Sequence, residues 1–167
     1  MTCRAEAGGP LHLTLADPAA TARLAAQLAR LVRPGDILAL HGALGSGKTS
    51  FARAFITALA GQPVEVPSPT FTLVQTYATP MGEVWHFDLY RLQRPAEAFE
   101  LGIEEAFAEG ISLIEWPDRL GPLLPTERLD VMLEEPEGSG AAATLRLATL
   151  VGQGGWAARL AALPDNV

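Results

Sequence analysis

The spacing of apolar residues at the start of the chain predicts a strand followed by a helix. Leu11–Leu15 alternates weakly between apolar and polar side chains, which is typical of a strand. Asp17 can cap the helix that follows, with Pro18 in its first turn. Apolar residues recur at helical spacing within it, at Leu24, Leu28 and Leu31. Pro34 and Gly35 end this helix.

Three more strands and a second helix are predicted in the middle of the chain. The uninterrupted apolar run Ile37–Leu40 indicates a buried strand. A helix follows this strand and ends near Gly61, and one face of it carries the apolar residues Phe51, Phe55 and Leu59. The two segments Phe71–Tyr77 and Val84–Tyr90 predict a β-hairpin around the turn Thr79–Gly82.

The last part of the chain predicts two helices and three strands. A helix after Pro95 has an acidic face, which we interpret as solvated surface; its members are Glu97, Glu100, Glu104, Glu105 and Glu109. Ile111–Ile114 is a second short apolar strand, and its similarity to Ile37–Leu40 suggests that the two lie together in a parallel core. Two later strands are expected at Leu129–Leu133 and Thr144–Leu150, before a closing helix at about 156–163.

The segment between the first buried strand and its helix fits the phosphate-binding motif G-x-x-x-x-G-K-[ST]. Its residues, with the next one, are Gly42, Ala43, Leu44, Gly45, Ser46, Gly47, Lys48, Thr49 and Ser50. The glycines let backbone N–H groups turn inward, and the helix start adds its unpaired N–H groups. The expected fold is one α/β domain spanning residues 1–167, a P-loop NTPase-like sandwich with a mixed parallel and antiparallel sheet flanked by helices.

Lys48 stands out because it is the only lysine among 12 basic residues, the rest being arginine. A compact ammonium fits between phosphates where a planar guanidinium would not. Lys48 can therefore reach the β- and γ-phosphates, while the hydroxyl of Thr49 can bind Mg²⁺.

Two acids are candidates for a second role at this site. Glu115 ends the strand Ile111–Ile114, where an acid can hold Mg²⁺ or its waters. Asp88 lies between aromatic residues, which is costly unless it is paired or functional. It is expected to position the attacking water or a water on the metal, or else to form a salt bridge with Arg91 or Arg94.

Other residues near these acids have alternative interpretations. Thr70, within Ser68–Phe71, occupies the position of a segment that responds to the γ-phosphate in many phosphate-loop hydrolases, although the residues alone favour an ordinary proline turn. His41 is interpreted as structural. His86 is either a core histidine or a contact of Asp88, and Trp116 serves either packing or a partner.

Composition limits the class of protein. The chain has 167 residues and 49% hydrophobic residues, with no apolar run of membrane-spanning length, no signal pattern in Met1–Pro10 and only one cysteine, Cys3. We therefore expect a cytoplasmic protein without membrane contact. The net charge of −7 argues against unaided binding to nucleic acid, so any role there is expected to be exercised through partners.

Four blocks together resemble the bacterial TsaE (YjeE) family, a small ATPase needed to make N6-threonylcarbamoyladenosine in tRNAs that read codons beginning with A. They are His41–Thr49, Ser68–Val74, His86–Leu92 and Leu113–Pro117. The resemblance implies ATP and Mg²⁺ as cofactors and slow hydrolysis that is activated by TsaD and TsaB type partners. It also implies a monomer when alone, and tRNA contact only through the partners.

The resemblance also assigns residue roles. Thr49 and Glu115 would bind Mg²⁺, Asp88 would be catalytic or linked to the metal, and Thr70 would sense the nucleotide state. Asp17 and Pro18 would lie near the adenine, and Arg146 on the late strand would contact nucleotide.

Three other functions are alternatives to a TsaE-type ATPase. A small-molecule kinase would need an arginine-rich lid, for which only Arg119 and Arg128 are candidates. A GTP-dependent switch would need an Asn-Lys-x-Asp motif, which is absent because Lys48 is the only lysine. A module that uses ATP only as structural glue would show no turnover with partners.

Overall fold

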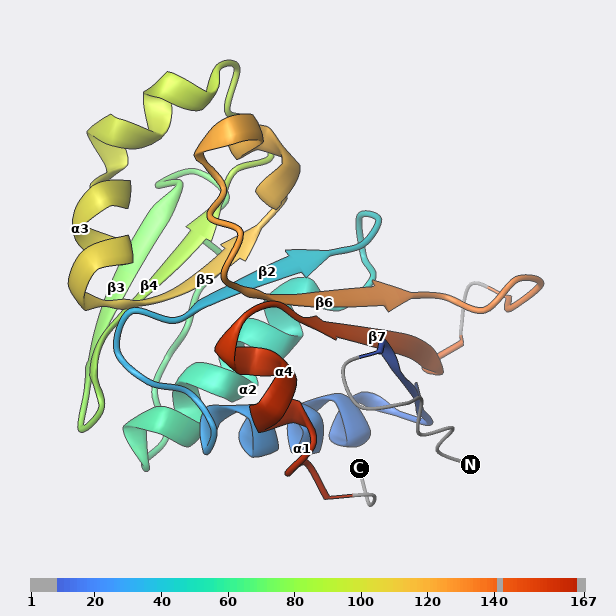
Figure 1. Ribbon diagram of the computed structural model, residues 1–167. Coiled ribbons are helices and arrows are strands. Elements are labelled where there is room, and N and C mark those ends of the chain that lie inside the picture. Colours follow the sequence, from blue (N-terminus) through green and yellow to red (C-terminus); the bar gives the residue numbers. More distant parts are fainter. Residues whose placement is uncertain (1–8, 141–142, 165–167) are drawn as a thin grey trace.

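The computed structural model describes residues 9–140 and 143–164, and its centre is a seven-stranded mixed sheet (Figure 1). The strand order is β1-β7-β6-β2-β5-β4-β3. The strands are β1 (Leu11–Leu15), β2 (Ile37–His41), β3 (Val74–Thr79), β4 (Gly82–Asp88), β5 (Ile111–Glu115), β6 (Leu129–Glu134) and β7 (Arg146–Gly152). Strand β2 is parallel to both β5 and β6, and β4 is parallel to β5, whereas the remaining pairs are antiparallel. The predicted mixed sheet is confirmed.

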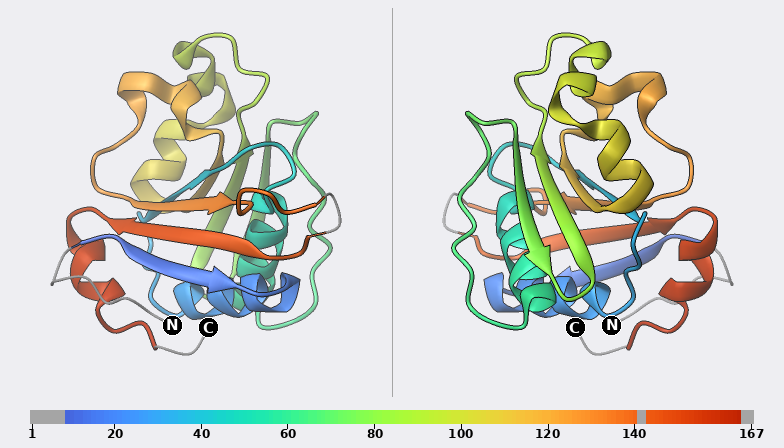
Figure 2. Two further views of the ribbon diagram at one scale, coloured as in Figure 1. Left: turned by 90° about the vertical axis from the view of Figure 1, so that its right-hand side faces the viewer. Right: turned by 90° about the vertical axis from the view of Figure 1, so that its left-hand side faces the viewer.

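Helices cover both faces of the sheet. One face carries α1 (Pro18–Ala29), α2 (Lys48–Ala60) and α4 (Gly155–Leu160), and the other carries the 3₁₀ helix η1 (Pro95–Leu101), α3 (Ile103–Glu109) and the 3₁₀ segment η2 (Pro117–Leu123) (Figure 1). The side views of Figure 2 show the β3–β4 hairpin at one edge and β1 at the other.

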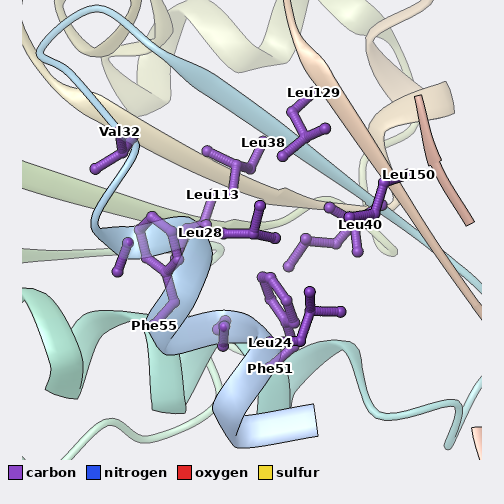
Figure 3. Packing of buried hydrophobic residues seen from close by; sticks show 14 of the residues in the cluster. Leu24, Leu28, Val32, Leu38, Leu40, Phe51, Phe55, Leu113, Leu129 and Leu150 are labelled. Atoms are coloured by element: carbon purple, nitrogen blue, oxygen red, sulfur yellow. The ribbon is translucent and has the colours of Figure 1, made fainter. Parts of the chain in front are cut away.

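The main core lies between the sheet and the pair α1–α2. Phe51 and Phe55 of α2 face leucines of the sheet, as Figure 3 shows, together with Leu24 and Leu28 of α1. All four side chains are completely buried, and burial of each stabilises the fold by about 1.5–3 kcal/mol. The helical spacing read from the sequence thus placed these residues on the correct face.

Several predicted boundaries were wrong in the hairpin. Strand β3 begins at Val74 rather than Phe71, because Leu73 has a positive φ of 65° and its N–H donates to the carbonyl of Pro69. Strand β4 ends at Asp88 rather than Tyr90, because the Asp88 carboxylate accepts the Tyr90 N–H at 3.1 Å and turns the chain.

The helix predicted after Pro95 is two shorter helices. Gly102 separates η1 from α3 with φ of 81°, which lets the chain change direction beside Trp85. Two later elements differ slightly from their predicted bounds. Strand β7 runs from Arg146 to Gly152, and α4 ends at Leu160. Cys3 lies outside the described residues.

Candidate active site

The loop from Gly42 to Gly47 joins β2 to α2 and depends on glycine. Gly42, Gly45 and Gly47 have φ of 146°, 80° and 105°. A Cβ on Gly42 would lie 2.3 Å from the hydroxyl oxygen of Ser46 and 2.4 Å from the carbonyl oxygen of Leu133, so a side chain does not fit there. Gly47 is the N-cap of α2, and no described side chain caps the first amides of that helix. These N–H groups are the usual anion donors of such a loop.

Lys48 lies under the loop and binds it in this structure. Its ammonium donates to the carbonyl oxygens of Gly42 at 2.7 Å and Ala43 at 2.8 Å, and lies 4.3 Å from the ring centroid of Trp116. Burial lowers the pKa of Lys48 from its usual value, and the carboxylates of Glu115 and Asp88 oppose this shift. Phosphate oxygens would offer the ammonium the same kind of acceptors that the loop carbonyls now provide.

Thr49 and Glu115 meet where α2 begins and β5 ends. The Thr49 hydroxyl lies 3.0 Å from both carboxylate oxygens of Glu115, as expected if the parallel strands carry the acid to the loop. A hydroxyl beside a carboxylate suits Mg²⁺, which prefers oxygen ligands and takes one or two carboxylates together with phosphates and waters. No group of three or more His, Cys, Asp or Glu residues forms a metal cage within the described part of the chain. The donors present therefore fit a cation that shares its ligands with a nucleotide.

Asp88 lies opposite Glu115 in the register of β4 and β5 and is 6% exposed. Its second carboxylate oxygen is 3.5 Å from the hydroxyl of Thr70, which in turn is 2.7 Å from the hydroxyl of Ser68. The alternative prediction of a salt bridge was wrong. Among the described residues, Arg94 pairs with Glu97 and Arg91 lies over the ring of Phe71.

Most of the sequence-predicted groups line one cavity of about 320 Å³. Its walls combine four separate stretches of sequence, and the lining residues are Leu44, Gly45, Gly47, Lys48, Thr49, Ser50, Ser68, Thr70, Asp88, Tyr90, Glu115 and Trp116. The volume suits a small ligand. The structure therefore brings the loop, both acids and Thr70 together.

Six predicted residues do not line this cavity, namely Gly42, Ala43 and Ser46 of the loop and Asp17, Pro18 and Arg146 outside it. Asp17 caps α1 by accepting the N–H of Ala20 at 2.7 Å, and Pro18 is the first residue of that helix. Arg146 donates to the carbonyl oxygens of Ser46 at 3.1 Å and Gly45 at 3.4 Å. Their proposed nucleotide contacts stay predictions.

The two arginines that were candidates for a kinase lid have contacts in the structure. Arg128 donates to Asp130 and to the carbonyl of Pro125, so its guanidinium is held away from the cavity. Arg119 lies 6.0 Å from the ring centroid of Tyr90.

Two residues at the site had unassigned roles in the sequence. His86 is completely buried and its Nε2 lies 2.7 Å from Glu115, not against Asp88. The sequence did indicate that His86 belongs to this site, because it lies two residues before Asp88 and both side chains are therefore on one face of the strand. Trp116 has a left-handed backbone, with φ of 59° and ψ of 51°, and holds its ring against Lys48. Nothing in the local sequence indicated that conformation.

His41 forms a second network behind the loop. Its Nε2 lies 2.8 Å from the carboxylate of Asp130, which also accepts from Arg128 at 2.9 Å. Burial raises the pKa of Asp130, but hydrogen bonds from His41 and Arg128 outweigh it, so the net shift is downward. This network agrees with a structural role for His41.

A strand, a glycine loop and a helix at the centre of a mixed sheet, with an acid at the end of the neighbouring parallel strand, define an α/β protein with a P-loop NTPase-like fold. The family model described as "Threonylcarbamoyl adenosine biosynthesis protein TsaE" matches residues 15–142. The chain therefore belongs to the TsaE family and shares its role in tRNA threonylcarbamoyladenosine biosynthesis.

Individual relatives agree with this assignment. The chain is 44% identical over 114 residues to a tRNA threonylcarbamoyladenosine biosynthesis protein TsaE of Rickettsia bellii, covering 68% of this chain and 79% of that protein. It is 36% identical over 119 residues to the Bacillus subtilis protein of the same name, covering 71% and 73%. The crystal structure of Bacillus subtilis YdiB superposes with a TM-score of 0.74 at 29% identity, covering 98% of this chain and 95% of that one. None of the helices in the described part has the length and apolar character needed to cross a bilayer.

Proposed function

We propose that this chain is a Mg²⁺-dependent ATPase that assists TsaD and TsaB type proteins in forming N6-threonylcarbamoyladenosine in tRNAs reading codons that begin with A. It acts as one domain in the cytoplasm, is a monomer until it meets its partners, and reaches tRNA only through them. The observation that carries the proposal is the contact between the Thr49 hydroxyl and both oxygens of Glu115, beside Lys48 and under the glycine loop.

The reaction is attack of water on the γ-phosphate of ATP. A bond forms between the water oxygen and phosphorus, the bond to the bridging oxygen breaks, and ADP and phosphate leave. Lys48 leaves the carbonyls of Gly42 and Ala43 to bind the phosphates, and the loop amides stabilise the developing charge. Thr49 and Glu115 would hold Mg²⁺, which neutralises charge on the phosphate oxygens.

Asp88 and Thr70 would act on the attacking water. Asp88 is an acceptor that can orient the water or take its proton, and Thr70 is linked to it by the 3.5 Å contact. Thr70 is also joined to Ser68, which is exposed, so a bound γ-phosphate would be sensed through this pair. Partners that order this segment would raise the rate.

The net charge of −7 supports the view that tRNA is handled by the partners, because a nucleic-acid backbone attracts Lys and Arg. The partner proteins would then detect, at the mouth of the cavity, whether ATP is bound. Tyr90, 46% exposed at this mouth, is available to such a contact.

The test combines this chain with purified TsaB and TsaD type proteins and follows both ATP loss and modified tRNA. We expect turnover that rises with the partners and disappears in Glu115→Ala. The control is Glu109→Ala, which removes an exposed glutamate of α3 outside the cavity and should behave as wild type. Modified tRNA formed at the full rate without ATP loss would contradict the proposal and favour ATP as structural glue.

A further inference from the structure

His86 is a buried polar residue to which the proposed mechanism assigns no role. It lies on β4, is 0% exposed, and its Nε2 is 2.7 Å from Oε1 of Glu115. Strands β4 and β5 are parallel neighbours, so this contact joins the two strands that carry Asp88 and Glu115. The hydrogen in this bond comes from His86, since an ionised carboxylate can only accept.

The other ring nitrogen of His86 shows that packing alone does not explain this residue. Its Nδ1 is buried and has no hydrogen-bond partner among the described residues. A buried polar atom without a partner costs free energy, whereas an apolar side chain would fill the same space without that cost. The contact with Glu115 is therefore the reason for a histidine here.

This contact distinguishes the two oxygens of Glu115. Oε1 is engaged by His86, while the single hydrogen of the Thr49 hydroxyl is shared between Oε1 and Oε2 at 3.0 Å each. Oε2 is thus the oxygen that a cation beside Thr49 can take without breaking the histidine bond. A carboxylate that could rotate freely would lose this preference.

We propose that His86 is a positioning residue that fixes the carboxylate of Glu115 so that Oε2 faces the cation bound with the nucleotide. The inference rests on the proposed function only in taking Thr49 and Glu115 as the ligands of that cation. It differs from a core-filling role because it requires an N–H at the position of Nε2, not merely a side chain of similar volume.

Three variants separate the two roles. His86→Gln can place an amide N–H near the position of Nε2, His86→Asn is too short to reach Glu115, and His86→Leu has no donor. The control is Ser112→Ala on β5, which removes a completely buried hydroxyl that has no hydrogen-bond partner in the described structure. Thermal melting and circular dichroism first establish that each variant is folded.

The measurement is Mn²⁺ binding in the presence of ADP, followed by the paramagnetic resonance signal of free Mn²⁺, with ADP affinity measured separately without metal. We expect His86→Gln and Ser112→Ala to bind Mn²⁺ within about twofold of wild type. His86→Asn and His86→Leu should weaken Mn²⁺ binding about tenfold or more while leaving metal-free ADP affinity unchanged.

The possible failures are distinguishable. Wild-type Mn²⁺ binding in His86→Leu, or equal Mn²⁺ affinities in the Gln and Asn variants, would overturn the role of His86 and leave the proposed function intact. If the leucine variant does not fold, the comparison of Gln with Asn decides the question. No Mn²⁺ binding by the wild-type chain with ADP would instead overturn the metal site of the proposed function.

Discussion

At the scale of single residues, three polar groups of the cavity are each held by an exchangeable partner. Lys48 binds two loop carbonyls, the Thr49 hydroxyl binds Glu115, and Asp88 accepts from Thr70. A phosphate, a cation or a water would replace these partners with chemically similar ones. The groups are therefore already oriented by the protein, which reduces the reorganisation required on binding.

The shape of the cation at position 48 should matter as much as its charge. Lys48→Arg keeps the positive charge but puts a wider, planar group into the space between the loop carbonyls and the ring of Trp116. We expect ATP turnover with partners to fall about 100-fold or more. Arg30→Lys, on the exposed surface next to α1, is the control, and wild-type turnover in Lys48→Arg would contradict the prediction.

Asp130 should make stability depend on pH on the acid side. Its folded-state pKa lies below the usual 3.8 because His41 and Arg128 outweigh the effect of burial. The unfolded chain therefore binds this proton more readily, so the stabilisation is present above about pH 4 and is lost as pH falls through the lower folded value.

Urea unfolding from about pH 5 down to about pH 3 tests this sign. Wild type should lose more stability over that range than Asp130→Asn, because asparagine does not titrate. Other carboxylates contribute equally to both proteins, so equal losses would contradict the prediction.

At the scale of elements, the unit β2–loop–α2 is shaped by its neighbours as well as by its own sequence. The loop packs against the carbonyl of Leu133 on β6, and Arg146 of β7 binds the loop carbonyls from outside. Glu135 pairs with Arg146 at 3.1 Å and helps to hold it there. The conformation of the loop thus depends on both of these strands.

Gly42→Ala should be more destabilising than Gly45→Ala. Both residues have positive φ, which costs a side chain about 1–2 kcal/mol, but only at Gly42 would the new Cβ collide with other atoms. We expect about 3 kcal/mol for Gly42→Ala and about 1 kcal/mol for Gly45→Ala. Denaturant unfolding measures both, and equal losses would show that the close approach to Leu133 is easily relieved.

At the scale of the whole molecule, parallel strands deliver the site to one edge of the sheet. Leu40 and Asp88 both lie opposite Glu115, on the two strands that flank β5. The carboxyl ends of β2, β4 and β5 therefore meet beside the start of α2. Ligand sites in open α/β sheets commonly lie at such an edge.

The closing helix α4 packs into the main core through Trp156 and Leu160, and an ion pair also joins it to the segment before β2. Arg159 lies 2.8 Å from Asp36 at the start of β2, and each side chain is about 15% exposed. Asp36→Ala should cost about 2 kcal/mol, between the values for exposed and fully buried pairs. Arg94→Ala breaks the exposed pair with Glu97 and should cost less than about 0.5 kcal/mol, as measured by thermal and denaturant unfolding. Similar costs for the two variants would contradict this view of α4.

The sequence by itself determined the features that depend on neighbouring residues. The strand Leu11–Leu15, the cap at Asp17 and the helix with Phe51 and Phe55 inside were all confirmed. The glycine loop was also readable, because apolar periodicity, capping and glycine spacing act over a few residues. The pairing of β2 with β5 was inferred from a different signal, namely that both runs are uniformly apolar and so suit a buried parallel core. These features also placed Glu115 beside Thr49.

Only the tertiary structure decided the partners of residues that are distant in sequence. It turned the chain at Leu73, selected Glu115 for His86, placed Trp116 against Lys48 and directed Arg146 to the outside of the loop. Each of these choices depends on which strands become neighbours and in what register. Because that order is set by burial of the whole sheet between its helices, no local pattern could specify it.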